Sequence, residues 1–113
     1  MATRPAEWHP RRGEVYLVQL DKPRPAVVIS VDAINKFALD VCVVGLTTTD
    51  CRRFSMRVPV KKGDGNLDFD CWAKCDQITT LEKALCRYPP IGVLAAETFG
   101  KIEEQVKICL GLS

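Results

Sequence analysis

The chain has 113 residues, of which 47% are hydrophobic and 27% charged, a composition typical of one soluble globular domain. The apolar content excludes intrinsic disorder as the main state, and the longest apolar runs are too short to span a bilayer. The net charge of +2 permits a nucleic-acid partner without demanding one, so a local basic patch has to make that case.

The first ten residues predict a flexible lead-in, followed by a single domain over residues 11–113. The lead-in contains two prolines and lacks both a periodic apolar pattern and the apolar stretch of a secretory signal. The chain carries six cysteines without a visible signal, which predicts a cytoplasmic protein with free thiols. A disulfide framework is the alternative.

Short strands separated by turn residues are predicted for most of the chain. Residues 13–20 are apolar on both faces, which is typical of a strand buried in a small barrel. Further strands are expected at residues 24–31, 39–46, 54–60, 71–78 and 87–94. Between the second and third strands we expect one short helical turn, capped by Asp32.

The C-terminal residues change to a helical period. Apolar side chains recur at spacings of four and three, at Ala95, Phe99, Ile102, Val106 and Cys109. This pattern predicts an amphipathic helix that ends near Gly111. Because several strands precede a single helix, the fold class is mainly β, a small antiparallel barrel with a packed C-terminal helix.

The cysteines do not form a recognisable metal motif. Cys71 and Cys75 lie four residues apart in a predicted strand, about 13 Å at roughly 3.3 Å per residue. One tetrahedral zinc cannot bind both, and the single histidine, His9, lies in the lead-in. We therefore interpret the cysteines as small buried hydrophobes and expect no metal and no other cofactor.

Arg24 lies between Pro23 and Pro25 at the start of the second predicted strand. The prolines restrict its backbone to extended conformations and remove two amide donors. A guanidinium held in this way is suited to binding a phosphate. From spacing alone, an ordinary surface arginine is an equal alternative.

Hydroxyl-bearing and basic side chains follow the third predicted strand. Thr47, Thr48 and Thr49 end an apolar run, where they either continue the strand or carry chemistry. The densest basic stretch consists of Arg52, Arg53, Arg57, Lys61 and Lys62. It is either a solvated hairpin or a set of contacts to nucleic-acid phosphates.

Taken together, these segments resemble the MazF/PemK toxins, the ribosome-independent mRNA-cleaving toxins of toxin–antitoxin modules. The resemblance covers about residues 11 to 112 and is carried by RGEVY from Arg12, RPAVVIS from Arg24, VVGLTT from Val43 and CDQITTL from Cys75. The loop before Arg24 has only the three residues 21–23 and is shorter than in many members. This difference bears on access to the active groove and on the RNA sequence that is read.

The resemblance implies an SH3-like antiparallel barrel of the CcdB–MazF type, a homodimer and a cognate antitoxin protein. It also implies a metal-independent endoribonuclease for single-stranded RNA, in which the 2′-hydroxyl attacks and leaves a 2′,3′-cyclic phosphate and a 5′-hydroxyl. Arg24 and Thr47 match the family's catalytic pair, with Thr48 as a close second. The expected RNA-binding residues are Arg52, Arg53, Lys61, Lys62, Asp76 and Gln77.

Two other functions are compatible with the same fold. One is a non-enzymatic toxin similar to the CcdB gyrase poisons, which would bind a protein through its terminal helices. Such a toxin has no need of Arg24 or the threonines. The other is an RNA-binding barrel that has lost cleavage activity, which the short loop before Arg24 keeps open.

Overall fold

This computed structural model describes residues 3–19, 21–54 and 56–112, and within them six strands form one antiparallel sheet in the order β4-β5-β3-β2-β1-β6. The strands are β1 (Glu14–Gln19), β2 (Pro23–Val28), β3 (Asp40–Thr47), β4 (Arg57–Val60), β5 (Cys71–Glu82) and β6 (Gly92–Val93). The helices are α1 (Asp32–Phe37) and α2 (Ala96–Cys109), with 3₁₀ turns at η1 (Asp64–Asn66) and η2 (Lys83–Leu85). None of the described helices is long and apolar enough to cross a membrane.

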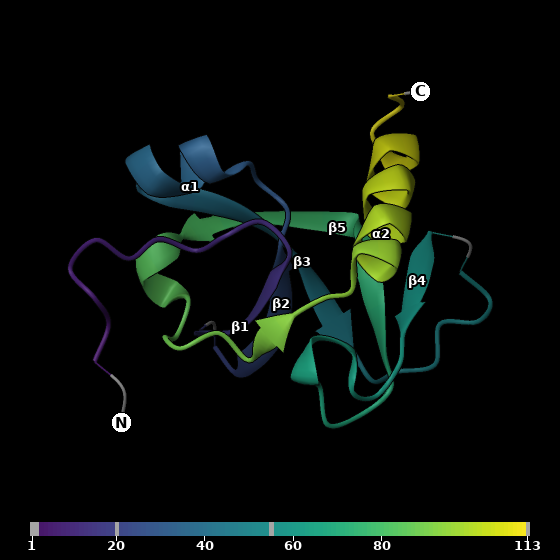
Figure 1. Cartoon of the computed structure of the whole chain (residues 1–113). Helices are drawn as coiled ribbons and strands as arrows, with labels where there is room; N and C mark the ends of the chain where they lie inside the picture. The colour runs from purple at the N-terminus through teal and green to yellow at the C-terminus, as the bar shows by residue number, and fades with distance from the viewer. Residues whose placement is uncertain (1–2, 20, 55, 113) are drawn as a thin grey trace.

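The sheet curls into a half-barrel (Figure 1). Each face of the sheet packs a hydrophobic core of its own. Helix α2 stands against β4 and β5 and covers the first face, where Ile102 is completely buried. Val15 of β1 faces this first core, whereas Tyr16 and Val18 face the second. The expected two-sided burial of the first strand and the mainly β fold class are both confirmed.

Helix α2 follows the predicted period, and its core-facing side chains are Phe99, Ile102, Val106 and Cys109. Ala95, expected as the first helical residue, is the N-cap and has no side-chain oxygen to offer. The Asp64 carboxylate instead holds this end of the helix, because it accepts the Ala95 N–H at 2.8 Å and the Thr98 hydroxyl. Gly111, with φ of 73°, ends the helix as expected.

The strand predicted for residues 54–60 is shorter in the structure. The N–H of Phe54 bonds to the carbonyl of Cys51 at 2.9 Å, and the N–H of Arg57 bonds to the Phe54 carbonyl at 3.1 Å. The chain therefore turns before β4 begins, and only β4 pairs with β5. Phe54 and Met56 are consequently exposed and do not extend the alternation of the strand.

Three further strands differ in extent from the prediction. The strand expected at residues 24–31 ends at Val28 in β2. The strand expected at residues 71–78 continues to Glu82, because β3 pairs with β5 as far as the pair Asp40–Glu82. The strand expected at residues 87–94 shrinks to β6. Its first half contains Pro89 and Pro90, which have no N–H to donate to a ladder.

Asp32 does not cap α1 as the sequence predicts. Val31 is the N-cap residue and makes no side-chain capping bond. The Asp32 carboxylate instead accepts a hydrogen bond of 2.7 Å from the backbone N–H of Arg12. This bond ties the first turn of α1 to the segment that enters β1.

The lead-in has no helix or strand over residues 3–10, as predicted, but it is attached to the domain. The Trp8 indole donates to the Tyr16 hydroxyl at 3.2 Å, the two rings meet edge to face, and Pro10 is buried. Five residues of the predicted segments lie outside the described residues. They are Met1 and Ala2 of the lead-in, Leu20 of the first strand, Ser55 of the fourth strand and Ser113 at the end of the domain.

Candidate active site

A small pocket opens where β2 separates from β3. Pairing between these strands ends at Ala26–Gly45, and Pro25 and Pro23 beyond it have no N–H to continue a ladder. The pocket has a volume of about 70 Å³, which suits a phosphate group rather than a whole nucleotide. Its lining comes from four strands and consists of Val18, Arg24, Pro25, Ala26, Val43, Gly45, Leu46, Lys74, Gln77, Thr79 and Leu81.

Arg24 and Thr47 leave the same face of the sheet. The last pair between β2 and β3 is Ala26–Gly45. Arg24 lies two residues before Ala26 and Thr47 two residues after Gly45, and side chains two residues apart on a strand share a face. The Arg24 side chain is exposed at the pocket, and Thr47 is half-buried at the end of β3. Thr48 lies just beyond the strand and is exposed.

The Thr47 hydroxyl is held in place locally. Its oxygen accepts a hydrogen bond of 3.2 Å from the backbone N–H of Thr49, a short contact typical of a threonine at the end of a strand. The hydroxyl hydrogen is thereby left available to donate. The site thus offers a guanidinium and a hydroxyl donor on one face.

An irregularity in β5 brings two more polar residues into the pocket. Between the pairs Val44–Ile78 and Leu46–Ala73, β3 has one residue, Gly45, whereas β5 has the four residues 74–77. Lys74 and Gln77 are three apart, so a regular strand would direct them to opposite faces. The bulge places both side chains on the same face, and both line the pocket. Gln77 was predicted from the sequence motif, whereas Lys74 was not.

The charges of the pocket are not neutralised by its own lining. Among the described residues, neither the Arg24 nor the Lys74 side chain forms a hydrogen bond or an ion pair, and no carboxylate lines the pocket. Asp76, the neighbour of Gln77, is held by the Arg57 guanidinium through contacts of 2.7 and 3.3 Å. The pocket is therefore cationic and suited to an anion.

The predicted basic stretch does not line this pocket. Arg52 and Arg53 are exposed on the loop after β3, and Lys61 and Lys62 are exposed after β4. Arg52 is paired with Asp50 at 2.7 Å, and its hydrogen bonds hold the pKa of that carboxyl below its usual value. These residues are accessible to a long ligand but lie outside the pocket itself.

The cysteines pack as apolar residues and all six are free thiols. Cys51, Cys71, Cys75 and Cys86 are buried, which confirms their interpretation as small core side chains. Burial raises the pKa of Cys75 to about 12 and that of Cys86 to about 11. A thiol is protonated when the pH is below its pKa, so these two groups are poor nucleophiles at neutral pH.

We expect a thiol-exchange reagent at mildly alkaline pH to label the half-buried Cys42 and Cys109 first. The buried thiols should react only after unfolding, because they are inaccessible in the folded protein and because the raised pKa values of Cys75 and Cys86 keep those two protonated. Mass spectrometry of folded and urea-unfolded protein measures the order. Fast labelling of Cys75 in the folded protein would contradict this assignment.

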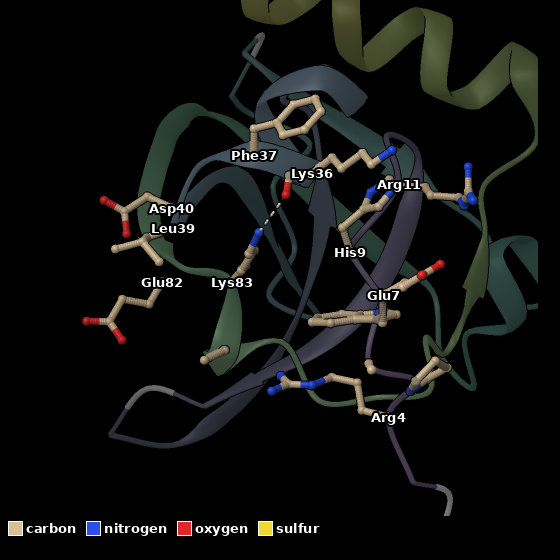
Figure 2. A pocket seen from close by; sticks show the side chains of 14 residues that line it. Arg4, Glu7, His9, Arg11, Lys36, Phe37, Leu39, Asp40, Glu82 and Lys83 are labelled. Atoms are coloured by element: carbon tan, nitrogen blue, oxygen red, sulfur yellow. Dashed lines mark hydrogen bonds between the residues drawn. The ribbon is translucent and has the colours of Figure 1, made fainter.

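A larger groove of about 1140 Å³ lies between the lead-in, α1, the start of β3 and the end of β5 (Figure 2). Two of its cations have partners, because the Lys83 ammonium donates to the carbonyls of Asn35 and Lys36 and the Arg4 guanidinium stacks on Trp8. His9 lines this groove, and its Nδ1 donates to the Pro10 carbonyl at 3.0 Å. Carboxylates share the lining, namely Glu7, Asp40 and Glu82. The smaller pocket is thus the better candidate for an anionic substrate.

The curled half-barrel, its C-terminal helix and its cationic pocket define the class of the MazF-type toxin endoribonucleases. The chain belongs to the PemK-like, MazF-like toxins of type II toxin–antitoxin systems, whose family model matches residues 11–110. Endoribonuclease MazF9 of Mycobacterium tuberculosis (strain ATCC 25618 / H37Rv) is 31% identical over 116 residues, which cover 90% of this chain and 97% of the relative.

Two similar solved structures support the same assignment. An endoribonuclease from a mycobacterial species has a TM-score of 0.81 and 29% identity, with 96% of this chain and 97% of that chain covered. An endoribonuclease in complex with its cognate antitoxin, also mycobacterial, has a TM-score of 0.79 and 28% identity, with 93% and 96% covered. The family, fold class and toxin-endoribonuclease class predicted from the sequence are confirmed.

Proposed function

We propose that Arg24 and Thr47 form the catalytic centre of an endoribonuclease that cuts single-stranded RNA without a metal ion. The observation that carries the proposal is an unpaired guanidinium on the same sheet face as a hydroxyl, beside a phosphate-sized pocket with no carboxylate in its described lining. A phosphodiester with developing negative charge is the ligand that such a pocket suits best.

Cleavage of this type uses the 2′-hydroxyl of the RNA as its nucleophile. The 2′-oxygen loses its proton and bonds to phosphorus, while the bond from phosphorus to the 5′-oxygen breaks and that oxygen gains a proton. Arg24 stabilises the charge on the phosphate oxygens, because its planar donors match two of them and its charge is permanent. The Thr47 hydroxyl donates to the phosphate or orients the 2′-hydroxyl, and Thr48 is the alternative donor.

RNA on either side of the cut requires further contacts. We assign the Gln77 amide to a nucleotide next to the scissile phosphate, because it lines the same pocket as Arg24. Neighbouring Asp76 is proposed to contact RNA through the edge that its pair with Arg57 leaves exposed. The remaining proposed contacts are to flanking phosphates, from Arg52, Arg53, Lys61 and Lys62.

The proposed partners are a cognate antitoxin and a second copy of this chain. One similar endoribonuclease has been solved with its cognate antitoxin, which supports the first. Exposed apolar side chains near the end of α2, at Ile108, Leu110 and Leu112, support self-association. Six free thiols are consistent with action in the reducing cytoplasm.

The proposed reaction predicts its own products. With EDTA present, we expect cleavage of a mixed-sequence RNA to persist and to leave 2′,3′-cyclic phosphate and 5′-hydroxyl ends, as mapped by end labelling and mass spectrometry. A substrate with a single 2′-deoxy sugar at the cut site should be bound and left intact, because its nucleophile is missing.

Each alternative function has a distinct outcome in the same assay. Loss of cleavage in EDTA, or 5′-phosphate products, would contradict the proposed chemistry. Binding of RNA without cutting would indicate an inactive barrel. Intact RNA together with inhibition of gyrase would indicate a toxin similar to CcdB.

A further inference from the structure

Lys74 has no role in the predicted site, although it lies in the candidate pocket. It comes from β5, is half-buried, and faces Arg24 across the intervening strand β3. The only β3 residue inside the bulge is Gly45, and the Lys74 side chain lies directly over it. A Cβ atom built on Gly45 would lie 3.1 Å from Lys74 Cε and 3.6 Å from Nζ.

The missing side chain of Gly45 therefore makes room for the lysine. Even a single added Cβ atom at this position would require the end of the Lys74 side chain to move by a few tenths of an ångström. Gly45 does not have a positive φ, so the glycine is not needed for the backbone. The space above it is its distinguishing contribution to the pocket.

The Lys74 ammonium has no anion of its own. Within the described part of the chain it makes no hydrogen bond and no ion pair, and the adjacent carboxylate of Asp76 is occupied by Arg57. Apolar side chains such as Val18, Ala26 and Val43 also line the pocket, which strengthens electrostatic interactions there. The half-buried Lys74 and the exposed Arg24 lie on the same pocket, so one anion bound there can neutralise both charges.

We propose that Lys74 is a second catalytic cation, which binds the scissile phosphate from the β5 wall while Arg24 binds it from the β2 wall. The proposal rests on the proposed function, since it uses the same pocket and the same reaction. Lys74 keeps its proton throughout, and it stabilises the charge that the phosphate gains as the 2′-oxygen bonds to phosphorus and the 5′-oxygen leaves. Gly45 acts as a positioning residue that admits the lysine.

The first test is Lys74→Met, which removes the charge and keeps the length of the side chain. We expect the single-turnover cleavage rate to fall by about 100-fold, the loss typical of one preorganised donor. We also expect a weaker salt dependence of binding to an uncleavable 2′-deoxy-substituted RNA. The slope of log affinity against log salt concentration should become less steep by about 0.7, the value for one phosphate contact on a single strand. Lys74→Arg, which keeps the charge, should retain most of that slope.

The second test links Lys74 to Gly45. Gly45→Ala should lower the cleavage rate in the wild-type background and leave it unchanged in a Lys74→Ala background, because only the lysine is displaced. Lys101→Met is the matched control, since it removes an exposed lysine on α2 and should change neither rate nor slope. Thermal unfolding of every variant confirms that the comparison is between folded proteins.

The results separate this inference from the proposed function. A wild-type rate and salt slope in Lys74→Met would overturn the role of Lys74 while leaving the Arg24 centre intact. Full activity in Arg24→Ala would overturn the Arg24 centre. In that case the salt dependence of binding of Lys74→Met to uncleavable RNA would still decide whether Lys74 binds a phosphate. A wild-type protein that neither binds nor cuts RNA would overturn both.

Discussion

Replacing Arg24 by alanine is expected to lower the single-turnover rate of RNA cleavage by about 100- to 1000-fold, the loss typical of one preorganised charge donor. The loss should appear mainly in the chemical step, because the guanidinium interacts most strongly with the phosphate once it carries extra charge. Rates measured at saturating protein, with end-labelled RNA in EDTA, isolate that step from binding.

The fold should survive this substitution. The Arg24 side chain is exposed and makes no hydrogen bond or ion pair with any residue that the structure describes, so its removal leaves no partner unsatisfied. Arg24→Lys should recover little activity, since an ammonium lacks the planar pair of donors. Arg11→Ala, which alters the larger groove, is the control that should cut RNA normally. A normal rate in Arg24→Ala would remove the proposed catalytic centre.

The packing faces could be predicted because apolar periodicity reports them directly. Tyr16 and Val18 alternate with Val15 in a strand with a core on each side, and Ile102 recurs with Phe99 on one side of a helix. Strand ends were less predictable, since they depend on pairing partners distant in the chain. The end of β5 at Glu82 is set by β3, and no residue near position 78 indicates it.

The candidate site was predictable only in part, for a similar reason. Arg24, Thr47 and Gln77 were found through motifs that resemble a family, whereas Lys74 was missed because strict alternation separates it from Gln77. The bulge in β5 reverses that alternation. One signal was present in the sequence, since an isolated glycine within an apolar strand, here Gly45, indicates a bulge or a close approach of another group.

The density of basic residues along the sequence does not indicate which side chains lack an acidic partner in the structure. The basic stretch contains both Arg52 and Arg57, but each is paired with an aspartate in the structure. The Arg57 partner, Asp76, is 19 residues away, so the pair is a consequence of the β4–β5 register. The unpaired cations of the pocket are isolated in the sequence, and only the curled sheet gathers them.

Truncating Ile102 to alanine is expected to destabilise the protein by about 2–5 kcal/mol, the usual cost of removing a large aliphatic side chain from a filled core. Ile102 is 0% exposed and is the central contact between α2 and the first face of the sheet. The substitution leaves a cavity that neighbouring side chains fill only partly. Alanine favours a helix slightly more than isoleucine, so the loss reflects packing rather than helix propensity.

The matched control for this prediction is Ile34→Ala, the same change at a helical position that is 51% exposed. It should alter stability by no more than about 0.5 kcal/mol. Urea unfolding followed by circular dichroism, with all variants at one protein concentration, measures both values and holds any self-association constant. Equal midpoints for the two variants would mean that α2 is not the element closing the first core. In that case the half-barrel would have to be stable without its terminal helix, and the Arg24 pocket on the opposite face would not depend on that helix.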